Sequence, residues 1–298
     1  MRRTRWLLAA VLLATALAFA EGTGRESDYS KGRCEESRRR LPEYIEWLHS
    51  KNPPVFPEFI VLWISYSDDP RAVQPMIEVL SDTTSFVSRG FAPYVTAADF
   101  LGKMGDKRAI PVLTRNLSLT RRFESSVWND QVHIECAAAL FRLGQLQKAL
   151  PVFRSVLAMG DRDLDIIPSN AFRVVGTPLD SYRGRAGALD TIYGYLREAA
   201  TSGNAELRAG AALQLVDVDT DLAFRVATDV LNLRTPERVQ DPKGWYYILG
   251  ARRAAVLVLG AIGDARAKLA LKALLTDSEK SVRVAADHAL SELSRSGK

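Results

Sequence analysis

Two short stretches of this chain match each other position for position and decide the fold: residues 105–109 read GDKRA and residues 263–267 read GDARA. Apolar residues follow both stretches at intervals of three and four, the spacing of one face of an α-helix. Glycine suits the left-handed end of a preceding helix, and aspartate can accept hydrogen bonds from the free amides that open the next helix. Each stretch therefore predicts a tight turn between two helices.

Related turns recur along the chain. They centre on residues 68, 105, 144, about 182, 219 and 263, so successive copies are separated by 37, 39, 38, 37 and 44 residues. Repetition at such a period indicates a solenoid. The apolar spacing on both sides of the turns is helical and does not alternate, so each copy is predicted to form helix A, a turn and helix B.

Alanine doublets precede four of the turns, at Ala97-Ala98, Ala137-Ala138, Ala211-Ala212 and Ala254-Ala255. Side chains this small let two helices approach closely. Residues 34–50 and 280–294 have apolar stripes suited to the two ends of the array, where a solenoid needs caps. The predicted fold is all-α: a right-handed α-solenoid of about six helix-turn-helix repeats with terminal capping helices.

The C-terminal copy also resembles a known family. Residues 254–267 read AAVLVLGAIGDARA and lead into VRVAADHAL at residues 282–290. This pattern resembles the HEAT and HEAT-like (phycobilisome-lyase type) repeats, and the resemblance extends over roughly residues 55–295, blurred at 160–186 and 234–247. It implies an armadillo-like superhelix that binds other proteins along its concave face or edges. A minority of the family attaches bilin chromophores.

The first twenty residues are typical of a secretory signal. Three arginines precede an uncharged run at residues 6–19, and Ala18 and Ala20 supply small residues at the cleavage positions before Glu21. This run is shorter than the about 20 apolar residues that a spanning helix needs, which favours cleavage before Glu21 over an uncleaved anchor or a buried helix. The expected organisation is a removed signal peptide at 1–20, an N-terminal segment and capping helix at 21–54, and the solenoid at 55–298. The protein is expected to be secreted or periplasmic.

Composition narrows the class of function. The 298 residues are 47% hydrophobic and 25% charged, as in soluble globular proteins. Removal of the signal peptide lowers the formal net charge from +5 to +2, because it takes away three arginines and no acid. Nucleic-acid binding draws on many phosphate contacts, so this charge argues against it. No nucleic-acid partner and no stable membrane span after cleavage are expected.

Catalytic motifs are not found in the sequence. His49, His133 and His288 fall in different parts of the array, too far apart to converge, and the chain has no glycine-rich phosphate loop or zinc-protease motif. We therefore expect no catalytic residue and no cofactor. The alternating acids Asp161, Asp163 and Asp165 are a weak metal-site candidate. Acids of turns and helix caps are the favoured interpretation of this ladder and of a second one at residues 217–221.

The two cysteines leave an alternative open. An oxidising compartment would permit a disulfide between Cys34 and Cys136, whereas separation of the N-terminal segment from the third repeat favours buried thiols. The oligomeric state is also left open by the sequence.

The loops between repeats, about 81–93, 118–130, 158–168 and 233–246, are predicted to lie on one edge of the solenoid. They concentrate residue types that are favoured at binding hot spots, although the aromatics could instead pack under their own loops. The partner-binding candidates are Phe86, Arg89, Phe91, Arg121, Arg122, Phe123, Trp128, Arg162, Arg234, Arg238 and Trp245.

The sequence thus predicts an exported, non-catalytic HEAT-repeat scaffold that binds a protein or peptide through its inter-repeat loop edge or concave face. The alternative is a ligand- or chromophore-handling protein that resembles the bilin lyases. A deep apolar pocket with a converging acid or histidine would favour the alternative, and a shallow groove would favour the scaffold.

Overall fold

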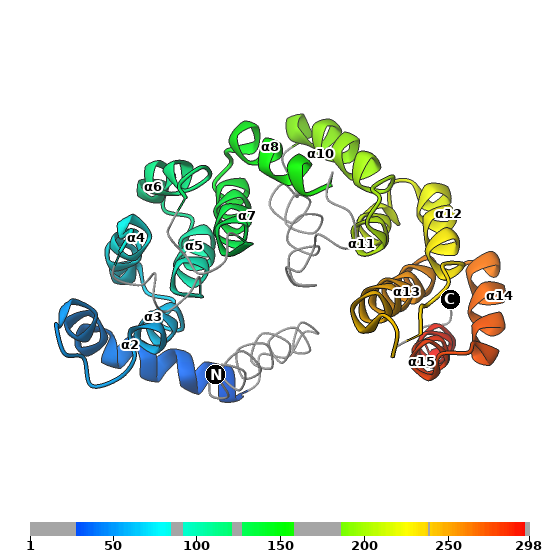
Figure 1. Ribbon diagram of the computed structural model, residues 1–298, viewed down its shortest axis with the longest axis horizontal. Coiled ribbons are helices and arrows are strands. Elements are labelled where there is room, and N and C mark those ends of the chain that lie inside the picture. The colour runs from blue at the N-terminus through cyan, green and yellow to red at the C-terminus, as the bar shows by residue number, and fades with distance from the viewer. Residues whose placement is uncertain (1–27, 85–91, 121–126, 158–185, 238, 296–298) are drawn as a thin grey trace. The chain divides into compact units, whose positions relative to one another are not determined.

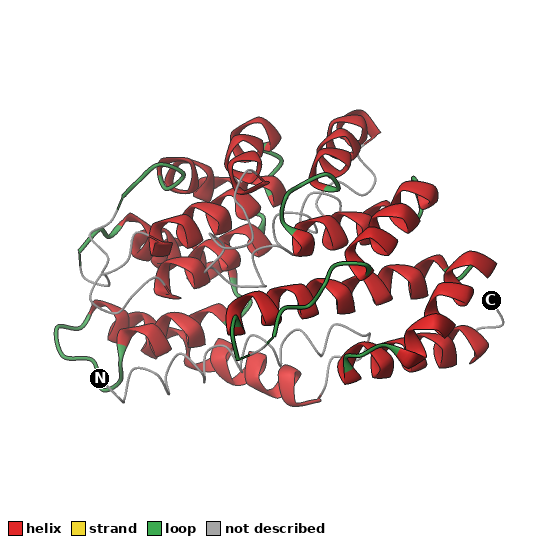
Figure 2. Ribbon diagram, turned by 45° about the vertical axis from the view of Figure 1, so that its right-hand side comes forward, coloured by secondary structure: helices red, strands yellow, loops and turns green. Residues whose placement is uncertain are grey.

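The computed structural model describes residues 28–84, 92–120, 127–157, 186–237 and 239–295. Every regular element in these ranges is a helix, and no strand occurs in them (Figure 2). The predicted all-α class is confirmed. The chain divides into two compact units, residues 1–75 and 76–298.

The first unit contains the predicted N-terminal capping helix. Its elements are α2 (Asp28–His49), α3 (Pro57–Ser65), the 3₁₀ turn η1 (Pro70–Ala72) and the first residues of α4 (Val73–Ser81). α2 packs against α3 and begins at Asp28, earlier than the predicted start at residue 34. The Arg38 Nε donates a hydrogen bond to the carbonyl oxygen of Ser67 at 3.2 Å, which satisfies a carbonyl just beyond the end of α3.

The second unit holds the remaining helices. In chain order they are α5 (Ala92–Met104), η3 (Lys107–Ala109), α6 (Ile110–Arg115), α7 (Val127–Arg142), α8 (Leu146–Leu157), α10 (Ala186–Ala199), α11 (Ala205–Leu215), α12 (Thr220–Leu231), α13 (Pro242–Ile262), α14 (Ala265–Ala273), η4 (Leu274–Thr276) and α15 (Lys280–Arg295).

These helices are arranged as repeats. α5, α7, α11 and α13 are A helices, and α6, α8, α12 and α14 are the B helices that follow them across a turn. α5 packs against α7, while α11, α13 and α15 form a row with α12 and α14 on one side (Figure 1). The α-solenoid of helix-turn-helix repeats is confirmed. The turn expected near residue 182 lies outside the described residues, and α10 follows it as a B helix.

Backbone geometry explains the recurring turns. Asp68, Gly105, Gly144 and Gly263 have φ angles of 48°, 70°, 79° and 64°, so these four predicted turn centres adopt the left-handed conformation. Glycine adopts this conformation without steric cost. The predicted turn at residue 219 is built differently, because Asp219 caps the N-terminus of α12 with its side chain.

The aspartates beside the turns act as N-caps. The Asp106 carboxylate bonds the Arg108 guanidinium at 2.7 Å, which holds the pKa of Asp106 below its ordinary value of 3.8. The backbone amide of Ala267 donates to Asp264 at 2.8 Å, and this bond, helped by Arg266, lowers the pKa of Asp264. Helix capping thus accounts for the Asp of the repeated motif, and an ion pair to that Asp accounts for the Arg.

Small residues form the contacts between A helices. A Cβ atom added at Gly102 of α5 would lie 2.7 Å from the Cα of Ala139 on α7. A Cβ added at Gly260 of α13 would lie 3.3 Å from the Cβ of Ala289 on α15. The alanine doublets are buried as well, since all members except half-buried Ala254 are 0% exposed.

Buried polar side chains tie successive repeats together. Each donates to a carbonyl at the C-terminal end of a B helix in the preceding repeat, where the helix itself supplies no donor. The three bonds are Asn116 Nδ2 to Leu80 O at 3.2 Å, Ser202 Oγ to Leu157 O at 3.0 Å, and Arg252 Nε to Leu231 O at 3.2 Å.

Helix α13 is unusually apolar. By length and composition alone its segment Gly244–Ile262, with mean hydropathy 1.3, is long enough to cross a membrane. A core helix of a soluble protein passes the same test, and α13 packs against α11, α12, α14 and α15. Helix packing accounts for much of its apolar character, although only 39% of the segment is buried.

Both cysteines are free thiols. The Cys34 Sγ lies 3.6 Å from the carbonyl oxygen of Ser67 and is half-buried, while Cys136 is 0% exposed.

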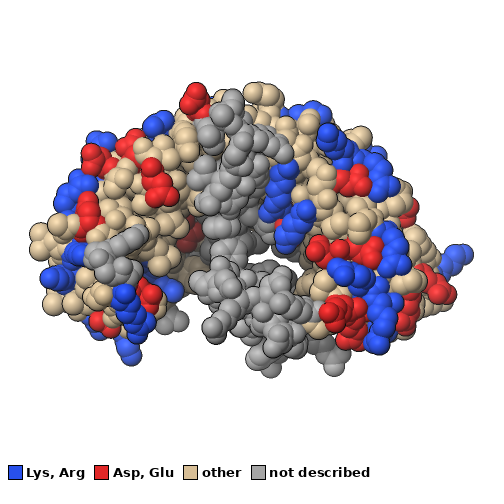
Figure 3. Space-filling model, turned by 180° about the vertical axis from the view of Figure 1, so that it is seen from behind, with Lys and Arg blue, Asp and Glu red and all other residues tan. Residues whose placement is uncertain are grey.

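Charged side chains of both signs are mixed on one face of the molecule (Figure 3). On the face shown in Figure 3, Lys and Arg alternate with Asp and Glu over the described residues. Several of these charges pair with neighbours, for example Arg154 with Glu198 at 3.1 Å.

Candidate partner-binding groove

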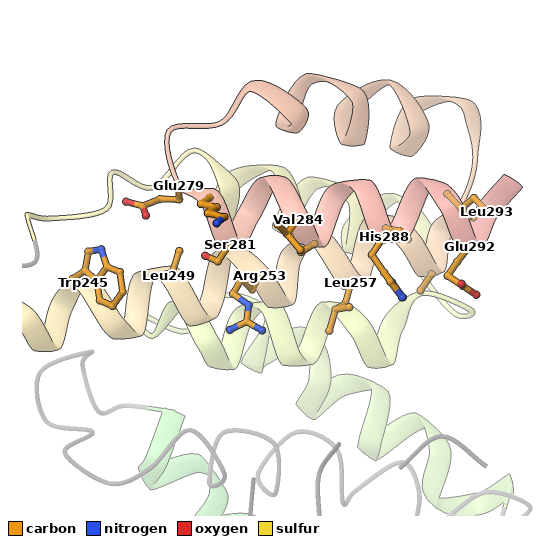
Figure 4. A pocket seen from close by; sticks show the side chains of 15 residues that line it. Trp245, Leu249, Arg253, Leu257, Glu279, Ser281, Val284, His288, Glu292 and Leu293 are labelled. Atoms are coloured by element: carbon orange, nitrogen blue, oxygen red, sulfur yellow. The ribbon is translucent and has the colours of Figure 1, made fainter. Parts of the chain in front are cut away.

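A groove of ≈ 1100 Å³ runs along α13 and α15, the last two helices of the row. The two helices run in the same direction, since Trp245 lies near Glu279 at one end and Leu257 near His288 towards the other (Figure 4). The close contact between Gly260 and Ala289 holds the helices together near that second end. We call this feature the α13–α15 groove.

The α13 wall is a single helical stripe. Trp245, Leu249, Arg253 and Leu257 recur at intervals of four residues, which places them on one face of the helix and in one line along the groove (Figure 4). The side chain of Asp241 caps this helix and Pro242 opens it, so Trp245 stands in the first turns of α13.

The α15 wall lies beside the buried stripe of that helix. Val282, Ala286, Ala289 and Leu293 are at most 9% exposed, as the capping-helix prediction required. The side chains that project into the groove alongside them are Ser281, Val284, His288 and Glu292 (Figure 4).

The groove exposes apolar side chains on both of its walls. Leu257 is 58% exposed and Val284 is 59% exposed, and they lie on opposite walls. Leu249, one turn before Arg253, is 8% exposed and forms part of the floor. Apolar residues gathered in a groove with a polar rim are typical of a binding surface.

The charges on the rim differ in whether they are paired. Glu292 bonds Arg295 at 2.8 Å, so this carboxylate has a partner outside the groove. The side chains of Arg253, Lys280, His288 and Glu279 have no hydrogen bond or ion pair in the part of the chain that the structure describes.

Arg252, next to Arg253, anchors the helix from its other side. It is 7% exposed, and its guanidinium donates to Asp277 Oδ2 at 2.5 Å and to Thr235 Oγ1 at 3.0 Å, besides Leu231 O. The same side chain therefore fixes the loops on both flanks of α13. It positions the groove without lining it.

Of the three predicted partner-binding residues that the structure describes, one lines the groove. Trp245 does so, but from helix α13 and not from a loop as expected, because Asp241 and Pro242 begin the helix before it. Arg234 is exposed in the loop that Arg252 fixes. Trp128 lies in the first turn of α7, which starts at Val127, and is likewise not in a loop.

The other partner-binding candidates lie outside the described residues, and the predictions for them stay predictions. They are Phe86, Arg89, Phe91, Arg121, Arg122, Phe123, Arg162 and Arg238.

The weak metal-site candidate also falls there, since Asp161, Asp163 and Asp165 are outside the described residues. Within the described ranges, no group of three or more His, Cys, Asp or Glu side chains is placed to hold a metal ion. In the second acidic ladder Asp219 is an N-cap, bonded by the amide of Leu222 at 3.2 Å.

Sequence reasoning missed most of the groove. No role is assigned to Leu249, Arg253, Leu257 or Val284 in the predictions from the sequence. The sequence does contain a signal for this exposed stripe. Leu257 lies on the same helix face as Trp245 and Leu249, at multiples of four residues. The neighbouring face, which packs into the core, is complete without Leu257.

Comparison with known proteins agrees with the repeat geometry. The family model described as PBS lyase HEAT-like repeat matches residues 94–118 and 251–277, which cover the two GD turns and parts of the A helices before them. The chain carries HEAT-like repeats. A search of curated proteins finds no match.

Two solved structures resemble these HEAT-like repeats over much of the chain. The complex of CpcE and CpcF of phycocyanin lyase from Nostoc sp. PCC7120 has a TM-score of 0.47 and 20% identity, covering 85% of this chain and 94% of that one. Human deoxyhypusine hydroxylase in complex with glycerol has a TM-score of 0.31 and 18% identity, covering 87% and 98%. At these values neither structure assigns an activity to this chain.

Proposed function

We propose that this protein is an exported HEAT-like repeat scaffold that binds another protein through the α13–α15 groove. The observation that carries the proposal is the pair Leu257 and Val284, two large apolar side chains more than half exposed on facing walls of one groove. Burying them against a partner removes apolar surface from water, which is the main driving force of association.

The shape of the groove favours a polypeptide segment. Twelve residues separate Trp245 from Leu257, which corresponds to about 18 Å along a helix. A groove of this length between two helices matches the helix-in-groove mode of peptide recognition. Binding on α13 and α15 modifies the expectation of a loop-edge site, since only the Trp245 end adjoins a predicted loop.

Site-specific photocrosslinking in the native host tests the proposal. A crosslinking residue at position 257 should give a discrete adduct with one partner. The matched control is position 269 on α14, because Leu269 is also an exposed leucine, at 72%, and does not line the groove. Val284→Asp should abolish the adduct at 257. Equal adducts at both positions, or an adduct insensitive to Val284→Asp, would contradict the proposal.

Export is part of the proposal and rests on the N-terminal sequence. The basic start, the apolar run at 6–19 and the small residues before Glu21 support a cleavable signal. Mass spectrometry of the exported protein should find Glu21 at its N-terminus. An exported chain that retains Met1 would show an anchor.

A second candidate function is the handling of a ligand or chromophore. It is favoured by His288 and Glu292, which line the same apolar groove and supply the histidine and the acid that such a function requires. Titration of the purified protein with a bilin should then shift the pigment's absorption spectrum, and His288→Ala should abolish the shift. An unchanged spectrum would exclude this candidate.

A further inference from the structure

We propose that the segment bound in the α13–α15 groove is an amphipathic helix that carries acidic side chains beside its apolar face. This inference rests on the proposed function, because it specifies the chemistry of the partner at the same site. It follows from the unpaired charges of the groove and from their position among the apolar residues.

Arg253 is the central observation. It lies one helical turn from Leu249 and one turn from Leu257, in the middle of the apolar line on α13. Its side chain is exposed and has no hydrogen bond or ion pair among the described residues. A ligand that covers Leu257 also covers this guanidinium, which then needs a partner because an unpaired buried charge is costly.

A carboxylate is the partner that suits Arg253 best. The guanidinium offers a planar fork of donors that binds a carboxylate through two parallel hydrogen bonds. Such a bond gains strength when the surrounding apolar side chains exclude water. The acid must stand beside the apolar face of the ligand, as it does on an amphipathic helix.

The other rim charges add to this preference. Lys280, at the start of α15, is a second cation without a described partner. Of the two acids on the rim, Glu292 is already paired with Arg295, and Glu279 is beside Lys280 in sequence near the Trp245 end. Lys280 and Glu279 thus offset each other at the Trp245 end, and Arg253 leaves the middle of the groove with a positive charge that favours an acidic ligand.

Arg252 supplies an internal contrast. Its guanidinium makes three hydrogen bonds inside the protein, whereas that of its neighbour Arg253 makes none among the described residues. Two consecutive arginines on one helix thus have different roles. Packing accounts for Arg252 and gives no account of Arg253.

Selection from a peptide library tests the inference. The probes are helical peptides of about 15 residues, four turns, with leucines on one face and random residues at the flanking positions. Peptides selected on the full protein should be enriched in Glu and Asp at the flanks. Arg253→Glu and Leu257→Asp should each weaken a selected peptide at least about tenfold, and Leu269→Asp should leave its affinity unchanged.

A charge swap provides the sharper measurement. A selected peptide in which one flanking Glu is replaced by Lys should lose affinity for the native protein and regain it with Arg253→Glu. Circular dichroism of each variant should match the native protein, because both altered side chains are exposed. If Leu257→Asp does not fold, Val284→Asp on the opposite wall replaces it.

The outcomes separate this inference from the proposed function. Peptides that depend on Leu257 but carry basic or neutral flanks would overturn the acidic partner and leave the groove as a binding site. Selection that yields no peptide sensitive to Leu257 would overturn both. A self-associated protein that Leu257→Asp converts to a monomer would show that a second copy occupies the groove, and the inference would be wrong.

Discussion

The A helices α5 and α13 share a motif but present different surfaces. Each carries a glycine three residues before its turn glycine, Gly102 in α5 and Gly260 in α13, and each of these glycines lies against an alanine of the next A helix in the row. Six residues before the turn, however, α5 has Asp99 and α13 has Leu257. The backbone contact is common to both repeats, and the surface beside it is not.

The residue six positions before the turn changes the surface between the two helices. Asp99 bonds Arg142 of α7 at 3.1 Å and Lys103 of its own helix at 2.7 Å, so ion pairs occupy the surface between α5 and α7. At the equivalent place between α13 and α15, Leu257 contributes exposed apolar surface and a groove. The repeat motif therefore sets the packing, and the residues beside it determine which pair of helices exposes an apolar groove.

The position eleven residues before the turn gives the largest predicted effect. Here α5 has buried Tyr94, and α13 has Arg252, whose ion pair with Asp277 is buried. Arg252→Met should cost about 3 to 5 kcal/mol of unfolding free energy, because it leaves the Asp277 carboxylate buried without its cation. Chemical denaturation measures this cost.

The neighbouring residue is the matched control. Arg253→Met changes an exposed side chain without a described partner and should alter the unfolding free energy by less than about 0.5 kcal/mol. Equal losses from the two variants would mean that the buried ion pair does not hold α13 in place.

The shared glycine position gives a smaller effect that differs between the repeats. In Gly102→Ala the new methyl group meets the backbone of Ala139 at 2.7 Å, which separates α5 from α7 and should cost about 1 to 3 kcal/mol. In Gly260→Ala the nearest atom is a methyl group at 3.3 Å. A shift of a few tenths of an ångström accommodates it, and the gain in helix propensity of up to about 1 kcal/mol offsets the strain. The midpoint temperature of thermal unfolding should therefore be lower for Gly102→Ala than for Gly260→Ala.

The capping aspartates give the smallest effect, visible as a dependence on pH. The pKa values of Asp106 and Asp264 are lowered by the folded structure, so their contribution to stability is complete above the ordinary pKa of 3.8 and is lost as pH falls through the folded values. Asp106→Asn and Asp264→Asn should each flatten the acid limb of a stability profile. Both groups are near the surface, which keeps the change small. An acid limb identical to that of the native protein would show that neither charge contributes.

The sequence predicted the repeats well because repeat packing requires the same residue types at a regular spacing. The turn glycines at 105, 144 and 263, the buried alanines and the capping helices all recur or form stripes, and each has one dominant physical reason. For the same reason the sequence predicts an aspartate directly before a B helix, and Asp69, Asp106 and Asp264 lie at such positions.

The groove has a much weaker pattern in the sequence. Whether an apolar residue such as Leu257 meets another helix or water depends on which helix lies beside it, and this is decided by the neighbouring repeat. Trp245 was selected for its residue type in a supposed loop, and only the start of α13 at Pro242 shows that it heads a helical line. Arg252 and Arg253 are indistinguishable by type and adjacent in sequence, so their opposite environments could not be predicted.

The polar ties between repeats bear on how the chain folds as it is synthesised. The carbonyls of Leu80, Leu157 and Leu231 receive their donors from Asn116, Ser202 and Arg252, which in every case come later in the chain. A ribosome releases the chain from the N-terminus, so each of these B helices emerges before the side chain that completes its end. The carbonyl at the newest helix end of a nascent chain thus stays exposed to solvent until its hydrogen-bond donor has been synthesised. The hydrogen bonds between repeats therefore form one after another, from the N-terminal repeats to the C-terminal ones.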